Sequence, residues 1–413
     1  MRGFAQRAKA AARVMANATT AQKNQALTAL ATELRARTSS IVEANALDLA
    51  DAKAAGKNPA FLDRLLLDAA RIDAMAKAVE FIVTLEDPIG EVTETWRRPN
   101  GLEVRKVRLP LGVVLMIYES RPNVTSDAAA LCLKSGNVAL LRGGSEAFRS
   151  NKAIAEALSA ALSTAGLPGD AAMLVPDTSR ESMLALLTLD GLIDLCIPRG
   201  GEGLIRFVAE NARVPVVKHY QGVCHVYVHR DADLAAAERI VVNAKASRPG
   251  VCNAMECLLV DEAVAATALP RLARALLEKK VELRGCEKTV ALLQGVPVTH
   301  ATEADFGKEF LDLICAVKVV SGLDGALEHI ARYGSEHTEA IVTSSRDAAR
   351  RFTREVTASG VIVNASTRFN DGGELGLGAE VGISTSRLHA FGPMGLRELT
   401  AQKFVVEGDG QIR

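Results

Sequence analysis

The first 90 residues carry apolar side chains at helical spacing. Steps of three and four residues return to the same side of a helix, as they do along Ala26, Leu27, Leu30 and Leu34. The pattern changes at residues 91–108, where polar and apolar residues alternate around Asn100 and Gly101. An Asn-Gly pair between alternating segments is a strong hairpin signal. The chain is therefore predicted to begin with helices and to continue into a polar β-hairpin that carries Trp96.

From residue 112 onward, short apolar runs alternate with longer amphipathic segments. The apolar runs predict strands at Gly112–Ile117, Val138–Arg142, Ala171–Pro176, Ile193–Pro198 and Val214–Lys218. The segments between them predict helices at Ser126–Ser135, Glu146–Ala165, Arg180–Leu189 and Glu202–Ala212. This alternation favours a parallel sheet with helices on both faces. Sheets of this kind bind ligands at the carboxyl ends of their strands.

A second α/β stretch follows. It predicts helices at Asp233–Lys245, Val264–Lys279, Gly325–Tyr333 and Asp347–Val356. It predicts strands at Met255–Val260, Asp312–Val320, Ala340–Thr343 and Gly360–Asn364. Residues 366–395 are Gly-rich and irregular, and the tail contains a short predicted strand, Lys403–Glu407. The chain is long enough for two or three domains.

Composition narrows the function. The 413 residues include 49 basic and 49 acidic side chains, so the formal net charge is zero, and aromatic residues make up 4%. We therefore expect neither nucleic acid nor an anionic membrane as a partner. No segment is long and apolar enough to span a bilayer. The Ala-rich N-terminus continues into further helix and lacks the long apolar run of a secretory signal, so we expect a soluble, cytosolic protein.

The seven cysteines form no CxxC pair, so neither a disulfide framework nor a zinc site is predicted. Cys252 differs from the cysteines in apolar runs because it lies in SRPGVCNAME, residues 247–256. Pro249 ends the preceding helix, and Gly250 permits a close approach of backbone. A thiol at a loop apex near Arg248 suits a nucleophile. An incidental loop cysteine fits this segment equally well.

Polar residues follow three of the predicted strands. Asn123, after the first strand, could donate a hydrogen bond to a developing oxyanion, although loop asparagines more often hold turns. Arg142, Gly143, Gly144 and Ser145 end the second strand and offer a cation and open backbone to a phosphate or ribose, or form a simple turn. Arg199, Gly200 and Gly201 precede a helix, where backbone N–H groups can face a pyrophosphate. This last signal is weak alone because it is not GxGxxG.

Three histidines lie close together in the sequence: His219, His225 and His229. His225 and His229 fall in the strand-like segment CHVYVH, and no carboxylate stands at ligand spacing. We interpret them as structural or surface histidines and predict no metal.

Together these segments resemble the aldehyde dehydrogenase superfamily. Within it, the chain is most similar to the branch that acts on L-glutamyl 5-phosphate. The resemblance covers essentially the whole chain and rests on IYESRPNVTSDAAALCLKSGN, LLRGGSEAFRSN, IPRGGEGLI, SRPGVCNAMECLLV, EFLDLICAVKVV, NASTRFNDGGELGLGAEVGIST and HAFGPMGL. It implies that NADPH reduces L-glutamyl 5-phosphate to L-glutamate 5-semialdehyde, with release of phosphate and NADP+, in proline biosynthesis.

The resemblance also implies site residues. Cys252 matches the nucleophile, and Asn123 falls where the superfamily has its oxyanion asparagine. Arg142 falls where the superfamily usually has a lysine that touches the adenosine ribose, and Glu309 matches the glutamate that holds the nicotinamide ribose. The remaining expected cofactor contacts are Gly143, Ser145, Arg199, Gly200 and Gly201. Beyond the resemblance, we expect Arg248 or Lys134 to contact the leaving phosphate, and Ser366, Thr367 and Arg368 to contact the glutamate amino and carboxylate groups, although Arg368 could equally be a surface charge.

Two departures from the superfamily bear on the chemistry. Residues 218–228 contain no carboxylate where hydrolytic relatives place a general base, although His219 could act weakly in its place. Ser145 stands where NAD-preferring relatives often carry a glutamate, which favours NADPH. Two alternatives stay open: a hydrolytic aldehyde dehydrogenase, and a non-catalytic member that binds nucleotide or a partner enzyme.

The resemblance implies an α/β, aldehyde dehydrogenase-like fold. We expect a Rossmann-type NADP-binding domain from residues 1–90, 110–220 and 380–396, and an α/β catalytic domain from residues 221–379. Residues 91–109 and 397–413 are expected to form a small β element for oligomerisation. A homo-oligomer, dimer or tetramer, is therefore expected, together with a transient contact with glutamate 5-kinase.

Overall fold

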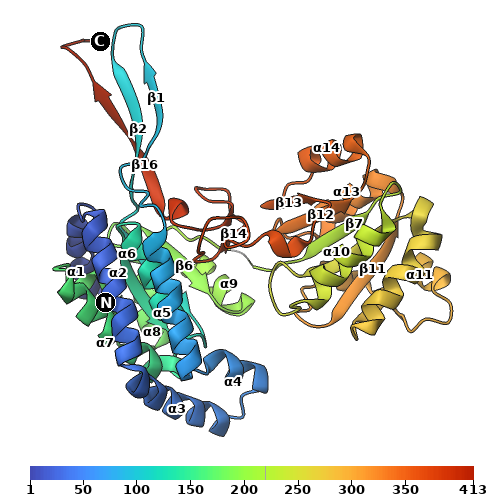
Figure 1. Cartoon of the computed structure of the whole chain (residues 1–413), viewed down its shortest axis with the longest axis horizontal. Helices are drawn as coiled ribbons and strands as arrows, with labels where there is room; N and C mark the ends of the chain where they lie inside the picture. Colours follow the sequence, from blue (N-terminus) through green and yellow to red (C-terminus); the bar gives the residue numbers. More distant parts are fainter. Residues whose placement is uncertain (219) are drawn as a thin grey trace. The chain divides into compact units, whose positions relative to one another are not determined.

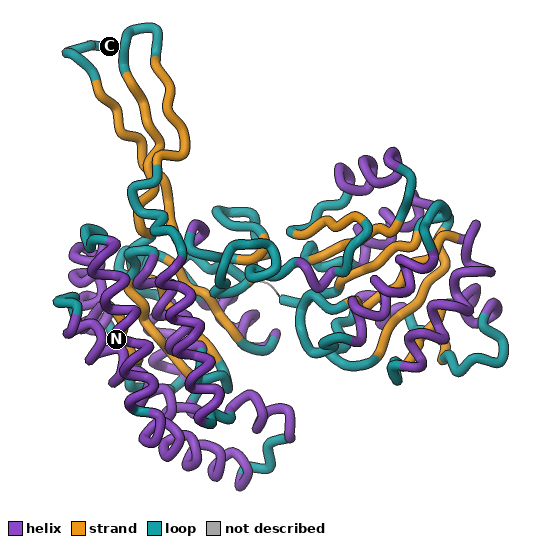
Figure 2. Tube along the Cα trace, viewed as in Figure 1, coloured by secondary structure: helices purple, strands orange, loops and turns teal. Residues whose placement is uncertain are grey.

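The computed structural model describes residues 1–218 and 220–413, and it divides into two compact units (Figures 1 and 2). The first unit contains Met1–Lys218, Gly376–Gly382 and Met394–Arg413. The second contains residues 220–375 and Ile383–Pro393. Residues 383–393 thus pack with the second unit, whereas the sequence had placed them with the cofactor domain. Strand β14 (Ile383–Ser384) pairs there with β15 (Gly392–Pro393). Among the described residues, no helix is long and apolar enough to cross a bilayer.

The predicted helical beginning is confirmed. It comprises α1 (Arg2–Met15), α2 (Thr20–Ala36), α3 (Thr38–Ala54), α4 (Pro59–Leu65) and α5 (Ala69–Thr84). Local signals fix where these helices start. Thr19 and Gln22 form a capping box at α2, and the Asn58 side chain caps α4, whose first residue is a proline. The apolar stripe that predicted α2 is buried, including Leu27, Leu30 and Leu34.

The first unit has a four-stranded parallel sheet in the order β5-β4-β3-β6. Its strands are β3 (Val113–Tyr118), β4 (Val138–Gly143), β5 (Ala172–Leu174) and β6 (Leu195–Arg199). The helices between and after them are α6 (Val124–Lys134), α7 (Phe148–Thr164), α8 (Arg180–Leu187) and α9 (Glu202–Asn211). Every residue of β3 and β4 is buried, which explains their continuous apolar runs.

The predicted strand at Val214–Lys218 was wrong. Only Val216 forms an isolated parallel bridge, with Cys196 of β6. Pro215 accepts a hydrogen bond from the Cys196 N–H but has no N–H of its own to donate. A proline at this position therefore limits the ladder to a single bridge.

The predicted hairpin and tail strand form one antiparallel sheet, β1-β2-β16, that extends away from the helices of the first unit (Figure 1). Its strands are β1 (Val92–Arg97), β2 (Glu103–Pro110) and β16 (Thr400–Glu407). Half-buried Trp96 meets exposed Phe404 edge to face, with ring centroids 6.1 Å apart.

The second unit has a seven-stranded parallel sheet in the order β10-β9-β11-β8-β7-β12-β13. Its strands are β7 (Cys224–Val228), β8 (Met255–Asp261), β9 (Glu282–Gly285), β10 (Thr299–His300), β11 (Ile314–Val320), β12 (Thr338–Val342) and β13 (Gly360–Val363). One face packs against α10 (Leu234–Ala246) and α11 (Glu262–Glu278). The other packs against α13 (Gly322–Tyr333) and α14 (Arg346–Glu355). Short α12 (Glu287–Leu292) follows β9.

Candidate active site

Cys252 lies on the loop that joins α10 to β8 in the second unit. The loop turns back on itself at the thiol, because the Ala254 N–H donates to the Val251 carbonyl at 3.0 Å. Cys252 is half-buried and in no disulfide, whereas five of the other six cysteines are buried. The predicted loop position is therefore confirmed, and the thiol lies on a helix-to-strand turn.

The segment that leads into β7 packs against the backbone of Cys252. A Cβ built on Gly222 would lie closer than 3.0 Å to the Cys252 carbonyl, so only glycine fits there. The Cys224 thiol donates to the same carbonyl at 3.2 Å. Burial raises the pKa of Cys224 well above its usual range, which keeps the donating proton on sulfur. We expected the close approach of backbone at Gly250, but a Cβ built on that residue would have no neighbouring atom nearer than 3.7 Å.

The side chain after the thiol ties this loop to residues 366–370. Asn253 donates to the Asn370 carbonyl at 3.0 Å, and Arg368 donates to the Asn253 side-chain oxygen. The Gly-rich segment thus contacts the loop that carries Cys252, as the sequence suggested. Ser366 caps the short helix η4 (Thr367–Phe369), and Thr367 is fully buried. The Ser366 and Thr367 side chains therefore support their own segment, whereas the Arg368 side chain reaches Asn253, the residue after Cys252.

A buried ion pair joins the two ends of the loop that carries Cys252. Lys245 at the end of α10 and Glu256 at the start of β8 lie 2.6 Å apart, and both are fully buried. Burial raises the pKa of Glu256 to about 7, against the opposing effect of Lys245. The Leu311 N–H donates to Glu256 at 3.3 Å, which brings the half-buried Glu309 segment to this end of the loop. Arg248, on the same loop as Cys252, is exposed.

In the first unit, Asn123 lies where β3 leads into α6. Its amide donates to Asp127, one turn later, at 2.8 Å. Burial raises the pKa of Asp127 to about 6, although the hydrogen bonds from Asn123 and Ser126 oppose this shift. Both side chains line a pocket between α6 and α5. Asn123 is therefore oriented by a partner and faces open space, as an oxyanion donor requires.

The end of β4 carries the next expected cofactor residues. Arg142 is buried, and its guanidinium donates to the Thr178 and Ser179 carbonyls. Burial lowers the pKa of Arg142, and its Nε has no partner among the described residues. A Cβ on Gly143 would strike the Asn151 amide, so glycine is required by packing at this point. Exposed Ser145 opens the short helix η1 (Ser145–Ala147).

The turn after β6 presents backbone N–H groups at the start of α9. Glu119, at the end of neighbouring β3, accepts a hydrogen bond from the Gly201 N–H at 3.0 Å. A Cβ on Gly200 would strike the same carboxylate. A second carboxylate, Glu146, accepts from the Ser120 N–H at 2.7 Å. Anionic oxygens therefore already lie against this edge of the sheet, the place where a pyrophosphate is expected.

The expectation for Lys134 does not hold. Its ammonium group lies at the end of α6, fully buried, and donates to Asn24 at 2.7 Å and to the Val83 carbonyl at 2.9 Å. Burial lowers its pKa. The side chain joins α6 to α2 and α5 and has no surface left for a substrate phosphate. His219 lies outside the described residues.

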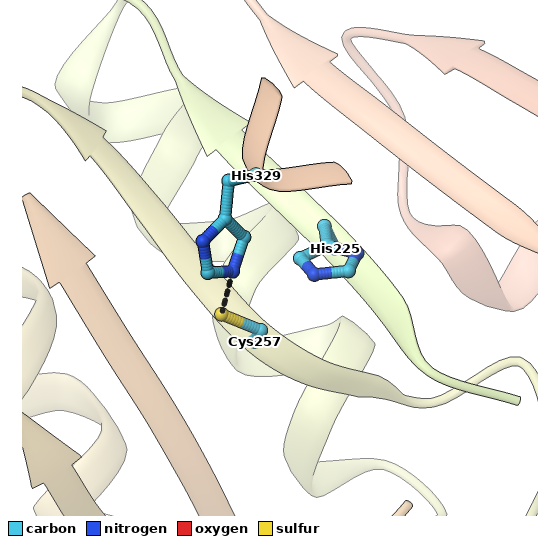
Figure 3. Close-up of side chains that lie close together, drawn as sticks. All are labelled: His225, Cys257 and His329. Atoms are coloured by element: carbon cyan, nitrogen blue, oxygen red, sulfur yellow. Dashed lines mark hydrogen bonds between the residues drawn. The ribbon is translucent and has the colours of Figure 1, made fainter. Parts of the chain in front are cut away.

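Three buried side chains in the second unit could approach a metal ion: His225, Cys257 and His329 (Figure 3). Their ligand atoms lie within 4.8 Å of one another, and Cys257 Sγ is 3.7 Å from His329 Nε2. His225 and Cys257 are partners on β7 and β8, and His329 comes from α13 above them. A closed zinc site takes four ligands, whereas this group supplies three and Cys257 already shares a hydrogen bond with His329, so it fits a hydrogen-bonded core better.

His329 should make folding sensitive to acid. Burial lowers its pKa to about 2, whereas an unfolded histidine titrates near 6.5. Below pH 6.5 the unfolded chain gains a proton that the folded chain does not, so the free energy of unfolding decreases as the pH is lowered. We expect about 2 kcal/mol less stability at pH 5.0 than at pH 7.5 from this residue. Urea denaturation of the wild type and of His329→Leu at both pH values measures it. Equal pH-dependent losses in the two proteins would contradict the assignment.

Comparison with known proteins agrees with this architecture. Residues 2–304 match the model described as "Aldehyde dehydrogenase family". The chain is 59% identical to a gamma-glutamyl phosphate reductase from Anaeromyxobacter sp. (strain Fw109-5) over 100% of this chain and 97% of that protein. It is 58% identical to one from Sorangium cellulosum, again over 100% and 97%. A crystal structure of gamma-glutamyl phosphate reductase from Thermotoga maritima superposes with a TM-score of 0.97 at 47% identity, covering 100% of this chain and 99% of that one. The chain therefore belongs to the aldehyde dehydrogenase family, within its gamma-glutamyl phosphate reductase branch.

Proposed function

We propose that this protein reduces L-glutamyl 5-phosphate to L-glutamate 5-semialdehyde with NADPH, releasing phosphate, as a step of proline biosynthesis. The observation that carries the proposal is that the chain is 59% identical over its full length to a gamma-glutamyl phosphate reductase. The half-buried Cys252 thiol, on a loop whose backbone accepts a hydrogen bond from Cys224, supports it. The chemistry of each residue supports the same reaction.

Cys252 is the nucleophile of the first step. Its thiolate attacks the acyl carbon of the substrate, a C–S bond forms, and the C–O bond to phosphate breaks. The negative charge that develops on the acyl oxygen needs donors that are already oriented. The Asn123 amide is held by Asp127, and the Cys252 N–H lies on a fixed turn, so each group is oriented within its own unit. Exposed Arg248 supplies a cation for the leaving phosphate.

The residues at the carboxyl edge of the first sheet fit a dinucleotide. Glu119 already places an anionic oxygen on the Gly201 N–H, which is the contact that a pyrophosphate oxygen would make at the start of α9. Arg142 retains an unpartnered buried Nε, and Ser145 adds no negative charge near a 2′-phosphate. Glu309 is the candidate for the nicotinamide ribose. When bound, reduced nicotinamide supplies the hydride for the second step.

The second step returns Cys252 to its starting state. Once hydride is supplied to the thioester carbon, Asn123 and the Cys252 N–H would again bear the oxyanion charge, and the C–S electron pair would return to sulfur as the aldehyde leaves. Water must not attack the thioester. Residues 220–228 carry no carboxylate that could activate water, which favours reduction over hydrolysis.

The decisive experiment runs the reaction backwards. L-Glutamate 5-semialdehyde should reduce NADP+ only when phosphate or arsenate is present, and NAD+ should serve less well. A hydrolytic aldehyde dehydrogenase would need neither anion. Equal rates with and without phosphate would therefore reject the proposed reaction, and no turnover at all would favour a non-catalytic nucleotide-binding member.

Glu119 should weaken cofactor binding. Its carboxylate accepts the hydrogen bond of the Gly201 N–H and would repel the charged pyrophosphate. Glu119→Gln keeps a hydrogen-bond acceptor but removes the charge, so we expect NADPH to bind about five-fold more tightly, or about 1 kcal/mol. Titration of NADPH fluorescence at low ionic strength measures the dissociation constant. The matched control is Glu156→Gln on α7, away from this edge. Weaker binding to Glu119→Gln would mean that the carboxylate contacts the cofactor favourably.

The β1-β2-β16 sheet is the proposed contact for a homo-oligomer. Phe404 and Val406 on β16 and Val92 on β1 are exposed apolar residues, which is unusual for strands that face only water. A three-stranded ribbon with so little buried surface is also marginal alone. Light scattering after gel filtration gives the number of subunits.

A further inference from the structure

The pocket beside Asn123 is built mainly from α4, α5 and the first turn of α6. It encloses about 270 Å³, and all of its lining residues belong to the first unit. At about 30 Å³ for each water molecule, this space corresponds to roughly nine waters. An L-glutamyl group has nine non-hydrogen atoms, and bonded atoms take less room than separate waters, so the group is small enough to enter the pocket.

The lining combines an apolar wall with charges of both signs. Leu66, Leu67 and Met75 provide the wall, and they suit methylene groups. Asp127 supplies a half-buried carboxylate on the same side as Asn123. A cation bound beside this carboxylate would stabilise its charged form, which burial disfavours. The pocket therefore offers an anionic partner to an ammonium group close to the candidate oxyanion donor.

Two arginines line the pocket, and they differ in how they are held. Arg71 is tied to Asp63, with Nη2 2.6 Å from the carboxylate, and it also donates to the Leu66 carbonyl at 3.1 Å. Arg64 is exposed and lies over the Phe61 ring at 6.0 Å, and it donates no hydrogen bond to the described residues. Arg64 is thus the arginine whose guanidinium is available to a carboxylate.

We propose that this pocket binds the zwitterionic end of an L-glutamyl substrate, with Asp127 taking the α-ammonium group and Arg64 the α-carboxylate. This inference rests on the proposed function and adds how the enzyme selects its substrate. It assigns the head group to the first unit, whereas the sequence pointed to Ser366, Thr367 and Arg368, whose side chains in part support their own loop.

The spacing along α6 fits the substrate. Asn123 and Asp127 are one turn apart on α6, and the Asn123 amide and the Asp127 carboxylate lie side by side on the pocket wall, 2.8 Å from one another. Four single bonds separate the reacting carbon of an L-glutamyl group from its amino nitrogen, and they span roughly 5 Å when extended. An L-glutamyl chain that lies along this wall can therefore place its acyl oxygen at the Asn123 amide and its ammonium group at the Asp127 carboxylate.

The phosphate-dependent reverse assay tests the Asp127 and Arg64 contacts separately when it is run with three aldehydes. These are L-glutamate 5-semialdehyde, 5-oxopentanoate, which lacks the amino group, and 4-aminobutanal, which lacks the carboxylate. Asp127→Asn should lower kcat/KM about 10- to 100-fold more for the two amino aldehydes than for 5-oxopentanoate. Arg64→Gln should lower kcat/KM similarly for the two carboxylates and spare 4-aminobutanal. Any loss that the Asp127 variant shows on 5-oxopentanoate reports the orientation of Asn123, so the ratio between substrates isolates the contact with the ammonium group.

Lys77→Gln is the matched control, because Lys77 is an exposed cation on α5 that pairs with Asp73 at 2.8 Å outside the pocket. It should leave all three rates unchanged. Equal losses on all three aldehydes, or no loss on any, in the pocket variants would overturn the inference. If the wild type shows no phosphate-dependent turnover, the proposed function fails, and calorimetric titration with L-glutamate then decides. Binding to the wild type that Arg64→Gln and Asp127→Asn lose supports the pocket, and undiminished or absent binding overturns it.

Discussion

Replacing Cys252 by alanine is expected to lower phosphate-dependent turnover by at least about 10⁴-fold. Without the thiol no thioester can form, and the remaining groups can only orient substrate and stabilise charge. The substitution removes one half-buried sulfur, and the Cys252 carbonyl that Cys224 and Gly222 contact remains in place. Folding and NADPH binding should therefore be nearly unchanged.

The measurement needs three readouts on the same protein: the reverse rate, NADPH affinity by fluorescence, and thermal unfolding. Cys286→Ala is the matched control. Cys286 is the other half-buried cysteine, and its sulfur lies 3.2 Å from the Thr289 hydroxyl, in a role that the mechanism does not use. It should retain the wild-type rate. Wild-type turnover by Cys252→Ala would refute the proposed mechanism, and loss of folding in that variant would show that the thiol is structural.

Much of the fold was predictable because its strands are buried on both faces. The apolar runs that marked β3, β4 and β8 are continuous, since helices cover both sides of a parallel sheet. The loop position of Cys252 followed from Pro249 and from the apolar strand after it. By contrast, β9 reads ELRG and alternates polar with apolar residues over only four positions, so no periodic signal identified it.

The contacts that hold the site could not be predicted from local sequence. Glu119 reaches Gly201 across 82 positions, and Cys224 reaches the Cys252 carbonyl across 28. Nothing near either residue signals such a partner. The error at Lys134 has the same origin. The chain shows a charged residue after an apolar run, but only the packing of α6 against α2 and α5 shows that this charge is buried and already bonded.

Gly222 provides the sharpest test of how the nucleophile is positioned. In Gly222→Ala the added methyl group would overlap the backbone of Cys252, with the carbonyl oxygen, the carbonyl carbon and Cα all closer than 3.0 Å. These are backbone atoms, so no side-chain rotation can relieve the overlap, and the catalytic loop must move. A displacement of about 1 Å at a reacting group lowers rates roughly 100-fold, and overpacking of this kind costs about 1–3 kcal/mol of stability.

Gly250→Ala supplies the comparison within the same loop, because its added Cβ meets nothing closer than 3.7 Å. The two variants make the same chemical change at two positions near Cys252, so differences between them report on contact with the Cys252 backbone. We expect Gly222→Ala to lose kcat/KM and thermal stability together, and Gly250→Ala to lose little of either. Equal effects in both variants would show that the loop is not held from the side of β7. In that case the Cys224 hydrogen bond and the close packing of Gly222 would not explain how the thiol is aimed.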